Sequence, residues 1–594
     1  MKLYKVILAI VGVVMLCSCS AIKRETESME KLSKQKIDPT EQTHKETTKW
    51  WKEAVCYEIY IRSFNDSNGD GIGDINGVTE KLDYLKDLGV DVVWITPFYP
   101  SPDVDMGYDI SDYKNIDPKF GTLEDFNNLV KKAHEKGIKI IVDMVFSHTS
   151  DQHKWFKEGR KSKNNPYHDY YFFLPPKDGN KLPNDWMSWF SGPAWEFNKQ
   201  TDEYYLHVFA VQQPALNWTN PEVREQMHGV AKFWLDQGAD GLRFDVITLI
   251  AMPPWSESDK LWGAMPKVHD YLKELNRDVL SKYDILTVGE MPGVNYENAW
   301  EYVGADKHQL ETVFQLDIMS GVDNKDGRKF EPAPMNLLKF KSIYENWYNG
   351  LYGKGWNSVV LGNHDQGRIV SRWGNDKKFR KESAKMLSTF LMTQWGTPYI
   401  YEGDEIGMTN CPFSESEFKD IEAINYYKTQ IKEGRNVADF MPGLLARCRD
   451  NSRTPIQWNA DKNAGFSTAD KTWIKVNPNY KKINVLEEQK DPDSIFNYYK
   501  KVIKMKKNNS AFTYGSYEQV DPKNENVYAY TRSDDSNSFL VVLNFKGEPA
   551  EVNTSISDIS SKKLLIRNYN GTPVIDKKGM VRLRPYEAIV FKVK

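Results

Sequence analysis

Short apolar segments alternate with longer amphipathic segments along most of this chain, from about residue 51 to residue 507. The short segments are rich in Val, Ile and aromatic residues, which is typical of buried β-strands. The longer ones carry apolar residues three and four positions apart, as on one face of an α-helix. The pattern predicts eight strands, over residues 55–64, 90–97, 138–146, 240–246, 285–291, 311–317, 358–365 and 398–403.

Helical patterns separate these strands. They are expected over residues 123–136, 223–237, 265–282, 337–348, 380–394 and 493–507. Strictly alternating strands and helices indicate βαβ units and a parallel sheet. Eight such units predict an α/β fold, a (β/α)8 TIM barrel. An open, doubly wound sheet is the alternative, but no glycine-rich phosphate loop follows the first strand.

Two regions depart from the barrel pattern. About 75 residues after His148 have little helical pattern and many Trp, Tyr, Asn and Pro residues, and they predict an inserted domain after strand three. From about residue 513, alternating strands separated by turn residues predict a C-terminal antiparallel β domain. The predicted divisions are a leader (1–18), a tether (19–48), the barrel (49–148 and 220–512), the insertion (149–219) and the C-terminal domain (513–594).

The N-terminus has the pattern of an export signal. Lys2 and Lys5 precede an apolar run over residues 6–16, which is shorter than the ~20 residues that span a bilayer. The run ends in Leu-Cys-Ser-Cys, which resembles a bacterial lipobox and implies a lipid-carrying Cys19. We therefore expect an exported protein, lipid-anchored to a bacterial membrane, in the periplasm or at the cell surface. An ordinary signal peptide with incidental cysteines is the alternative.

The formal net charge of −3 gives no electrostatic case for nucleic acid as a partner. Five cysteines show neither a disulfide framework nor a zinc-binding spacing. The flat aromatic faces of the 18 Trp and 32 Tyr residues suit contacts with sugar rings, although large cores account for most of these residues. Neither the oligomeric state nor the membrane leaflet can be predicted from these features.

Charged or imidazole side chains end four of the predicted strands, and His148 follows the third. Asp245, Glu290 and Asp365 close strands four, five and seven, and Arg243 lies two residues before Asp245. Because burying carboxylates is costly, such strand ends indicate an active site at the C-terminal face of a barrel. Glycoside hydrolysis needs an ionised nucleophile and a protonated acid. Arg243 can lower the pKa of Asp245, which fits the nucleophile, while Glu290, in a more apolar stretch, fits the acid.

Several motifs in this order resemble the α-amylase family of retaining glycoside hydrolases, in particular its oligo-1,6-glucosidase and α-glucosidase branch. They include Asp-Met-Gly-Tyr-Asp-Ile at 105–110, Gln-Pro-Ala-Leu-Asn-Trp at 213–218 and Arg-Asp-Asn-Ser-Arg-Thr-Pro at 449–455. The resemblance implies Asp245 as nucleophile, Glu290 as acid/base and Asp365 as transition-state stabiliser. It also implies a pocket for the non-reducing glucose, lined by Asp105, Tyr108, His148, Arg243, His364 and Arg449. Asp105 and Arg449 would close this pocket, which makes the enzyme exo-acting.

Val246 follows the nucleophile. In the family that this chain resembles, Val at this place accompanies α-1,6 linkages and Thr accompanies α-1,4 linkages, so we expect hydrolysis of isomalto-oligosaccharides. The alternatives are an α-1,4- or sucrose-acting enzyme, or a surface lipoprotein that binds glucans without turnover. Sucrose isomerases share the scaffold, but the stretch after strand seven has only Arg368 and Arg372, not a dense arginine cluster.

Residues 66–74 have the spacing of a calcium loop. Oxygen donors fall at Asp66, Asn68, Asp70 and Asp74, with a backbone carbonyl at Ile72. The loop resembles the calcium loop after strand one of the same glucosidases, which implies one structural Ca²⁺ and no organic cofactor. A metal-free Asn/Gly turn is the alternative. Ser147 stands where the family usually has Asn, which argues against a second metal.

Overall fold

The computed structural model describes residues 49–179, 181–251, 266–556, 558–576 and 578–594. The leader, the lipidation residue Cys19 and the tether therefore lie outside the described residues. Among the described residues, no helix has both the length and the apolarity that crossing a membrane requires. Cys56, Cys411 and Cys448 are free thiols, and all three are buried.

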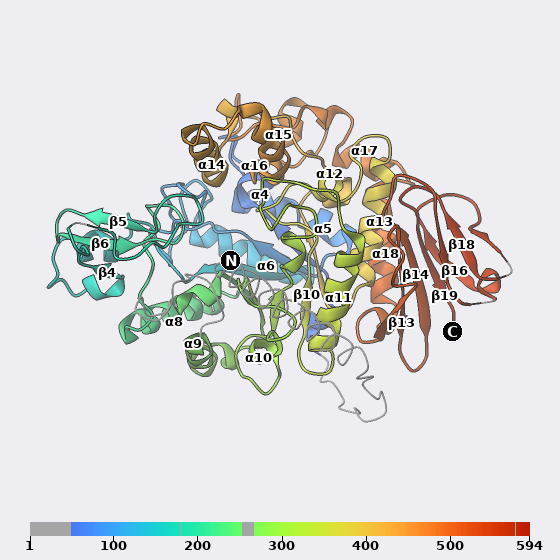
Figure 1. Ribbon diagram of the computed structural model, residues 1–594, viewed down its shortest axis with the longest axis horizontal. Coiled ribbons are helices and arrows are strands. Elements are labelled where there is room, and N and C mark those ends of the chain that lie inside the picture. The colour runs from blue at the N-terminus through green and yellow to red at the C-terminus, as the bar shows by residue number, and fades with distance from the viewer. Residues whose placement is uncertain (1–48, 180, 252–265, 557, 577) are drawn as a thin grey trace, which may run out of the picture. The chain divides into compact units, whose positions relative to one another are not determined.

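A closed barrel of eight parallel strands forms the centre of the fold, in the order β1-β11-β10-β9-β8-β7-β3-β2 (Figure 1). Its strands are β1 (Cys56–Ile59), β2 (Val92–Ile95), β3 (Lys139–Val145), β7 (Gly241–Asp245), β8 (Leu286–Gly289), β9 (Thr312–Phe314), β10 (Asn357–Val359) and β11 (Thr397–Tyr401). The predicted TIM barrel is confirmed. The strands are nearly continuous runs of buried residues, as in a sheet covered on both faces.

Most strands are shorter than predicted, with one consequence for the site. The predicted first strand, 55–64, ends at Ile59, and Ile61–Phe64 is a short helix, α3, whose four residues are all buried. A single helical turn of four residues is too short to show a helical period, so hydrophobic periodicity cannot separate it from a strand. Likewise β10 ends at Val359, so His364 and Asp365 lie in the loop after the strand rather than on it.

The crossover helices agree closely with the sequence pattern. They are α6 (Leu123–Glu135), α8 (Pro221–Asp236), α9 (Pro266–Asp278), α11 (Leu337–Leu351), α13 (Arg380–Thr393) and α18 (Ile495–Lys507). The start of α6 is fixed by a capping box in which Thr122 and Asp125 satisfy each other's backbone N–H groups. Pro221 opens α8 behind the cap residue Asn220.

The chain between β3 and β7 forms a small sheet of its own. Helix α7 (Lys154–Gly159) precedes strands β4 (Phe173–Leu174), β5 (Trp195–Asn198) and β6 (Glu203–Leu206), which are antiparallel in the order β4-β6-β5 (Figure 1). Its aromatic core includes Phe172, Trp186, Phe190 and Phe209, and it also takes in Val246 from the end of β7. The insertion is therefore packed directly onto the segment that follows Asp245.

A helical segment follows β11, with α14 (Ile421–Lys432), α15 (Val437–Arg447) and α16 (Asp450–Arg453). Asn425 of α14 donates to the backbone carbonyl of Phe190 over 3.0 Å. Helix α14 thus contacts the inserted sheet, although more than 200 residues separate them in the chain.

The C-terminal part consists of two antiparallel sheets, in the orders β12-β13-β14-β19-β16 and β15-β18-β17 (Figure 1). Their strands are β12 (Ser516–Val520), β13 (Val527–Ser533), β14 (Ser538–Asn544), β15 (Ala550–Asn553), β16 (Lys563–Arg567), β17 (Val574–Ile575), β18 (Met580–Leu583) and β19 (Ala588–Lys592). Aliphatic residues such as Leu540, Val552 and Ile589 form the core between them. The predicted C-terminal antiparallel sheets are confirmed.

Candidate active site

The ends of β7 and β8 are held together by two backbone hydrogen bonds. The N–H of Glu290 donates to the carbonyl of Phe244 (2.8 Å), and the N–H of Ile247 donates to the carbonyl of Glu290 (2.9 Å). Between these bonds Val246 turns the chain in the left-handed conformation, with φ 35° and ψ 44°. This conformation is costly for a β-branched residue and occurs where the surrounding structure imposes it. The backbone therefore places the side chains of Asp245 and Glu290 beside each other.

Arg243 joins three carboxyl groups beneath the site. Its Nη1 donates to both oxygens of Asp143 (2.8 and 2.9 Å) and to Oδ1 of Asp245 (2.9 Å), and its Nη2 contacts Glu290. The guanidinium is only 1% exposed and lies over the ring of Trp94. Alternation along the strand did place Arg243 beside Asp245. However, the more apolar stretch that holds Glu290 does not keep it away from a cation, because the same arginine contacts it.

Asp143 is a site residue that sequence reasoning did not single out. It pairs in register with Arg243 across β3 and β7, and it also accepts hydrogen bonds from Trp94 Nε1 (3.2 Å) and Tyr108 OH (3.1 Å). The available signal was a charged residue inside the otherwise apolar third strand, which has no stable place in a barrel unless it is paired.

Burial raises the pKa values of the two central carboxyl groups, Asp245 and Glu290, above those of ordinary acids. It raises the pKa of Asp245 to about 7, against a lowering influence of Arg243, and it raises the pKa of Glu290 to about 8, again opposed by Arg243. Arg243 therefore lowers the pKa of Asp245 as expected, but burial outweighs it. Of the pair, Glu290 is the more basic and holds the proton longer, which suits a general acid beside an ionised neighbour.

The surroundings of Asp365 have the opposite effect. Burial alone would raise its pKa, but His364, Arg449 and Arg453 together lower it below the ordinary value. Arg453 Nη2 and Arg449 Nη1 donate to Oδ1 of Asp365, at 2.9 and 3.4 Å. Burial also lowers the pKa of His364 to about 3, so this imidazole is neutral at neutral pH, with Nδ1 2.6 Å from Glu58.

The remaining predicted residues lie around the same space. Arg449 donates to Asp105 (3.0 Å) and to Asp420 (2.7 Å). The ring of Tyr108 stacks on that of His364, with centroids 5.1 Å apart and planes 7° apart. Burial lowers the pKa of His148 to about 4, so this side chain too is a neutral hydrogen-bonding group.

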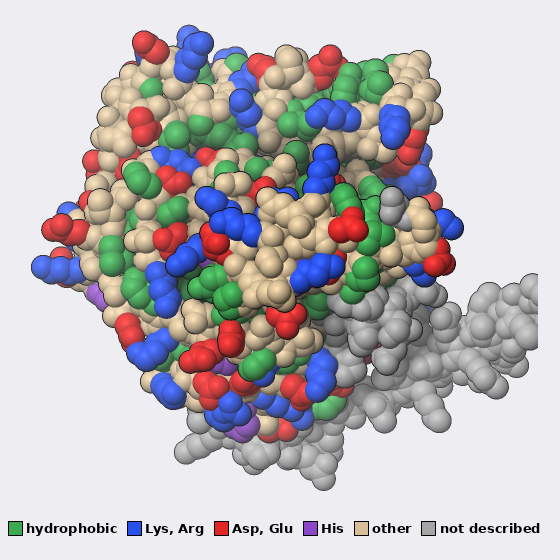
Figure 2. Space-filling view, turned by 90° about the vertical axis from the view of Figure 1, so that its left-hand side faces the viewer, with side chains coloured by type: hydrophobic (Ala, Val, Ile, Leu, Met, Phe, Trp, Pro, Cys, Tyr) green, Lys and Arg blue, Asp and Glu red, His purple; other side chains and the backbone are tan. Residues whose placement is uncertain are grey.

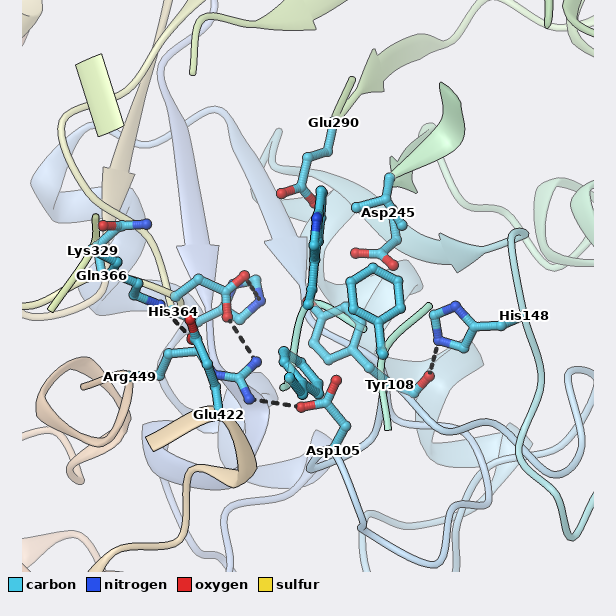
Figure 3. A pocket seen from close by; sticks show the side chains of 15 residues that line it. Asp105, Tyr108, His148, Asp245, Glu290, Lys329, His364, Gln366, Glu422 and Arg449 are labelled. Carbon is cyan, nitrogen blue, oxygen red and sulfur yellow. Dashed lines mark hydrogen bonds and ion pairs between the residues drawn. The ribbon is translucent and has the colours of Figure 1, made fainter. Parts of the chain in front are cut away.

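These residues enclose a cavity of about 370 Å³ (Figure 3), a size within the roughly 300–1,000 Å³ of small-molecule sites. All the predicted catalytic and substrate-binding residues line it except Arg243, which lies beneath it. The predicted residues that line the cavity are Asp105, Tyr108, His148, Asp245, Val246, Glu290, His364, Asp365 and Arg449.

The structure adds residues to the lining that sequence reasoning missed. They are Trp189, Phe190, Phe209, Lys329, Gln366 and Glu422. They come from the inserted domain, from the loop that follows β9, from the segment after Asp365 and from α14. The sequence held only a weak signal for them, namely that long loops on the C-terminal face of a barrel tend to be functional.

The predicted calcium loop is closed by its own side chains. The Asp66 carboxylate accepts from the backbone N–H groups of Asn68 (3.1 Å) and Gly71 (2.8 Å). The Asn68 side-chain oxygen accepts from the backbone N–H of Asp70 (2.9 Å), and the Asp70 carboxylate accepts from the backbone N–H of Ile72 (2.8 Å). In the described part of the chain, no group of three or more His, Cys, Asp or Glu side chains is placed to hold a metal ion. Both oxygens of Asp66 and Oδ1 of Asp74 already accept two hydrogen bonds each, so an ion here would have to replace some of these contacts.

The barrel and the carboxyl groups around this cavity define a class of enzyme, the glycoside hydrolases. Residues 58–515 match the family model described as the α-amylase catalytic domain, and residues 517–590 match the maltogenic amylase C-terminal domain. The first match covers more than half of the chain. The chain therefore belongs to the α-amylase family.

Two curated relatives are close in both sequence and length. The chain is 48% identical over 560 residues to the oligo-1,6-glucosidase of Parageobacillus thermoglucosidasius, which covers 92% of this chain and 99% of the relative. It is 42% identical over 559 residues to the trehalose-6-phosphate hydrolase of Bacillus subtilis, with the same coverage. Among solved structures, the trehalulose synthase of Pseudomonas mesoacidophila shares 40% identity, with a TM-score of 0.87, over 92% of this chain and 100% of that one.

Proposed function

We propose that this protein is an exo-acting, retaining α-glucosidase that hydrolyses terminal α-1,6-glucosidic bonds of isomalto-oligosaccharides. The observation that carries the proposal is the convergence of Asp245 and Glu290 on one guanidinium in a cavity with a buried inner end. Retaining glycosidases need two such carboxyl groups about 5–5.5 Å apart. The relatives named oligo-1,6-glucosidase, at 45–48% identity, agree with it.

Each carboxyl group has one role in the proposed mechanism. The Asp245 carboxylate attacks C1 of the terminal glucose while Glu290 gives its proton to the departing glycosidic oxygen, so that a glucosyl ester forms on Asp245. Glu290, now a carboxylate, takes a proton from water, whose oxygen attacks C1 and displaces Asp245. Glucose leaves with its original anomeric configuration, and Glu290 is protonated again. The ionised Asp365 favours the positive charge that develops on the sugar, and Arg243 favours the negative charge on Asp245.

The linkage preference rests on Val246. Its side chain lines the cavity and is only 4% exposed, so it presents methyl groups where a threonine would present a hydroxyl. An apolar wall beside the nucleophile favours a leaving group attached through a methylene carbon, as in an α-1,6 bond.

Sucrose is the second candidate substrate, because solved relatives include sucrose-acting isomerases such as the isomaltulose synthase of Erwinia rhapontici, at 42% identity. In this chain, however, Arg368 donates to the backbone carbonyls of Glu402 and Ser452, and Arg372 pairs with Asp323 at 2.9 Å. Neither arginine lines the cavity. A glucan-binding lipoprotein without turnover is disfavoured because Asp245 and Glu290, the pair of carboxyl groups that turnover needs, are both present in the cavity.

Location and metal binding are further parts of the proposal. The apolar run and Cys19 support lipid anchoring to a bacterial membrane after export. The spacing of side-chain oxygens along residues 66–74 supports one structural calcium ion, held by Asp66, Asn68, Asp70 and Asp74 with the carbonyl of Ile72.

The deciding experiment is glucose release from isomaltose and maltose, measured side by side with the chain lacking residues 1–19. A large preference for isomaltose is expected. A preference for maltose would keep the mechanism but remove Val246 as the determinant of linkage. Conversion of sucrose to an isomer without release of monosaccharides would favour the second candidate.

A further inference from the structure

The entrance of the cavity holds an indole ring that the proposed mechanism does not use. Trp189 lines the cavity and is 40% exposed, more than any other residue of the lining. The Tyr and Phe residues of the lining are far more buried, at 5% for Tyr108 and 7% each for Phe190 and Phe209. Trp189 therefore marks the solvent end of the cavity, and its ring has apolar surface that a ligand can cover.

The protein itself holds this ring in place. The backbone N–H of Trp189 donates to the carbonyl of Val208 (2.9 Å), and the Ser188 hydroxyl donates to the carbonyl of Phe209 (2.7 Å). The indole meets the ring of Phe209 edge to face, with centroids 5.3 Å apart and planes 73° apart. Because both the backbone and the ring are fixed in advance, a ligand that stacks on Trp189 loses little conformational entropy.

An ion pair between Lys329 and Glu422 also lines the cavity, and its two residues come from outside the inserted domain. Lys329, in the loop that follows β9, donates to Glu422 in the first turn of α14 over 2.6 Å, and both side chains line the cavity. Figure 3 shows Lys329, Gln366, Glu422 and Arg449 together on the side of the pocket opposite Glu290, Asp245 and His148. The cavity thus offers an apolar ring from the insertion and charged hydrogen-bonding groups from the barrel loops. A pyranose, with its apolar face and its hydroxyl rim, matches both.

We infer that Trp189 is a stacking platform for the sugar ring on the leaving-group side of the scissile bond. This inference builds on the proposed α-glucosidase function and names the residue that would bind the second pyranose ring of the substrate. The face of the molecule that carries the insertion has scattered hydrophobic side chains among charged ones, without one continuous apolar surface (Figure 2). A local role for Trp189 at the cavity is therefore favoured over a protein-docking surface.

The test compares substrates with and without that second ring. Initial rates are measured on isomaltotriose and on α-glucosyl fluoride for the parent, Trp189→Ala, Trp189→Tyr and Met187→Ala. Met187 is the matched control, because it is 57% exposed in the same loop but does not line the cavity. The measured quantity is the ratio of kcat/KM for the two substrates, which cancels a general loss of active protein.

In Trp189→Ala this ratio is expected to fall by about 3- to 10-fold, the value of one aromatic stacking contact, mainly through a higher KM for isomaltotriose. Trp189→Tyr should recover most of it, and Met187→Ala should leave it unchanged. An equal loss on both substrates would assign Trp189 a structural role and overturn the inference, as would an unchanged ratio. A parent that hydrolyses neither substrate would instead overturn the proposed function itself.

Discussion

Arg449 donates a hydrogen bond to Asp105 over 3.0 Å, although 344 positions separate the two residues in the chain. Asp105 follows β2, and Arg449 immediately precedes α16 after the long segment that leaves β11. The same guanidinium donates to Asp420 and lies 4.9 Å over the ring of Phe190. The second barrel loop, the segment after β11 and the inserted domain therefore meet at one side chain, which closes the inner side of the cavity.

The first prediction concerns this closure. Arg449→Lys keeps the charge but loses the planar fork that serves Asp105 and Asp420 together. We expect KM for isomaltose to rise by about 10- to 100-fold, equivalent to 1.4–2.7 kcal/mol, with a smaller change in kcat. Steady-state kinetics on isomaltose measure both constants. A kcat loss with unchanged KM would mean that Arg449 acts on the transition state alone.

The second prediction concerns the two central carboxyl groups. Asp245→Asn removes the nucleophile and Glu290→Gln removes the proton donor, so each should lower kcat by at least ~10⁴-fold while the fold is kept. Circular dichroism and thermal melting serve as the control for folding. Residual activity near that of the parent in either variant would show that the roles are assigned to the wrong residues.

The third prediction is a bell-shaped pH profile. Asp245 must be ionised and Glu290 protonated, and their pKa values are raised to about 7 and about 8. Hydrolysis should therefore decline below about pH 7, where Asp245 takes up a proton, and above about pH 8, where Glu290 loses one. Because the two groups lie side by side, the two limbs belong to the pair. A profile of kcat/KM on isomaltose that peaks below pH 5 would contradict this.

The fourth prediction concerns a buried cation far from the cavity. Lys506 of α18 is 1% exposed, and burial, helped by Arg532, lowers its pKa to about 7. Between about pH 7 and 10.5 the unfolded chain binds a proton that the folded chain does not. The free energy of unfolding therefore decreases as the pH falls through this range.

Lys506→Met should remove that penalty and stabilise the protein at pH 7 by roughly 3–4 kcal/mol, after about 1 kcal/mol for the hydrogen bond lost to Phe512. The gain should vanish at pH values above about 10.5, where both states of the parent lysine are neutral. Denaturant unfolding at several pH values measures it, with the exposed Lys504→Met as matched control. Equal stability of parent and Lys506→Met at pH 7 would show that Lys506 is charged in the folded state at no cost.

The fifth prediction concerns calcium. If the loop of residues 66–74 binds one ion, EDTA should lower the melting temperature and added Ca²⁺ should restore it, because a ligand that binds only the folded state stabilises it. Asp66→Asn and Asp70→Asn should reduce the response. A melting temperature that is the same with EDTA and with Ca²⁺ would favour the metal-free turn.

The sequence was sufficient for the barrel and for most of the site for one physical reason. A parallel strand buried on both faces must be apolar, so Arg243, Asp245 and Glu290 stand out against their neighbours and can be assigned to one face. The resemblance to the α-amylase family supplied Asp105 and Arg449, whose contact could not have been derived from spacing.

Other features depend on contacts that a sequence pattern does not contain. The pairing of Asp143 with Arg243 follows from the register of β3 against β7. The position of Glu422 follows from the path of a segment that starts after β11. In the sequence, Trp189 cannot be told apart from the many tryptophans of the core. Only its exposure in the structure sets it apart from them. The left-handed backbone of Val246 is invisible to propensity, because β-branched residues disfavour it.

Val246 lines the cavity and is also part of the hydrophobic core of the inserted domain. In that core it packs with Trp186, Phe190 and Phe209. If Val246 sets the linkage preference as proposed, a single side chain serves both substrate choice and the packing of the inserted domain. Directed evolution of linkage preference at this position should carry a hidden cost in expression and folding yield. Compensating substitutions are to be sought in the insertion's own core, for example at Leu249 or Ala215, rather than around the sugar.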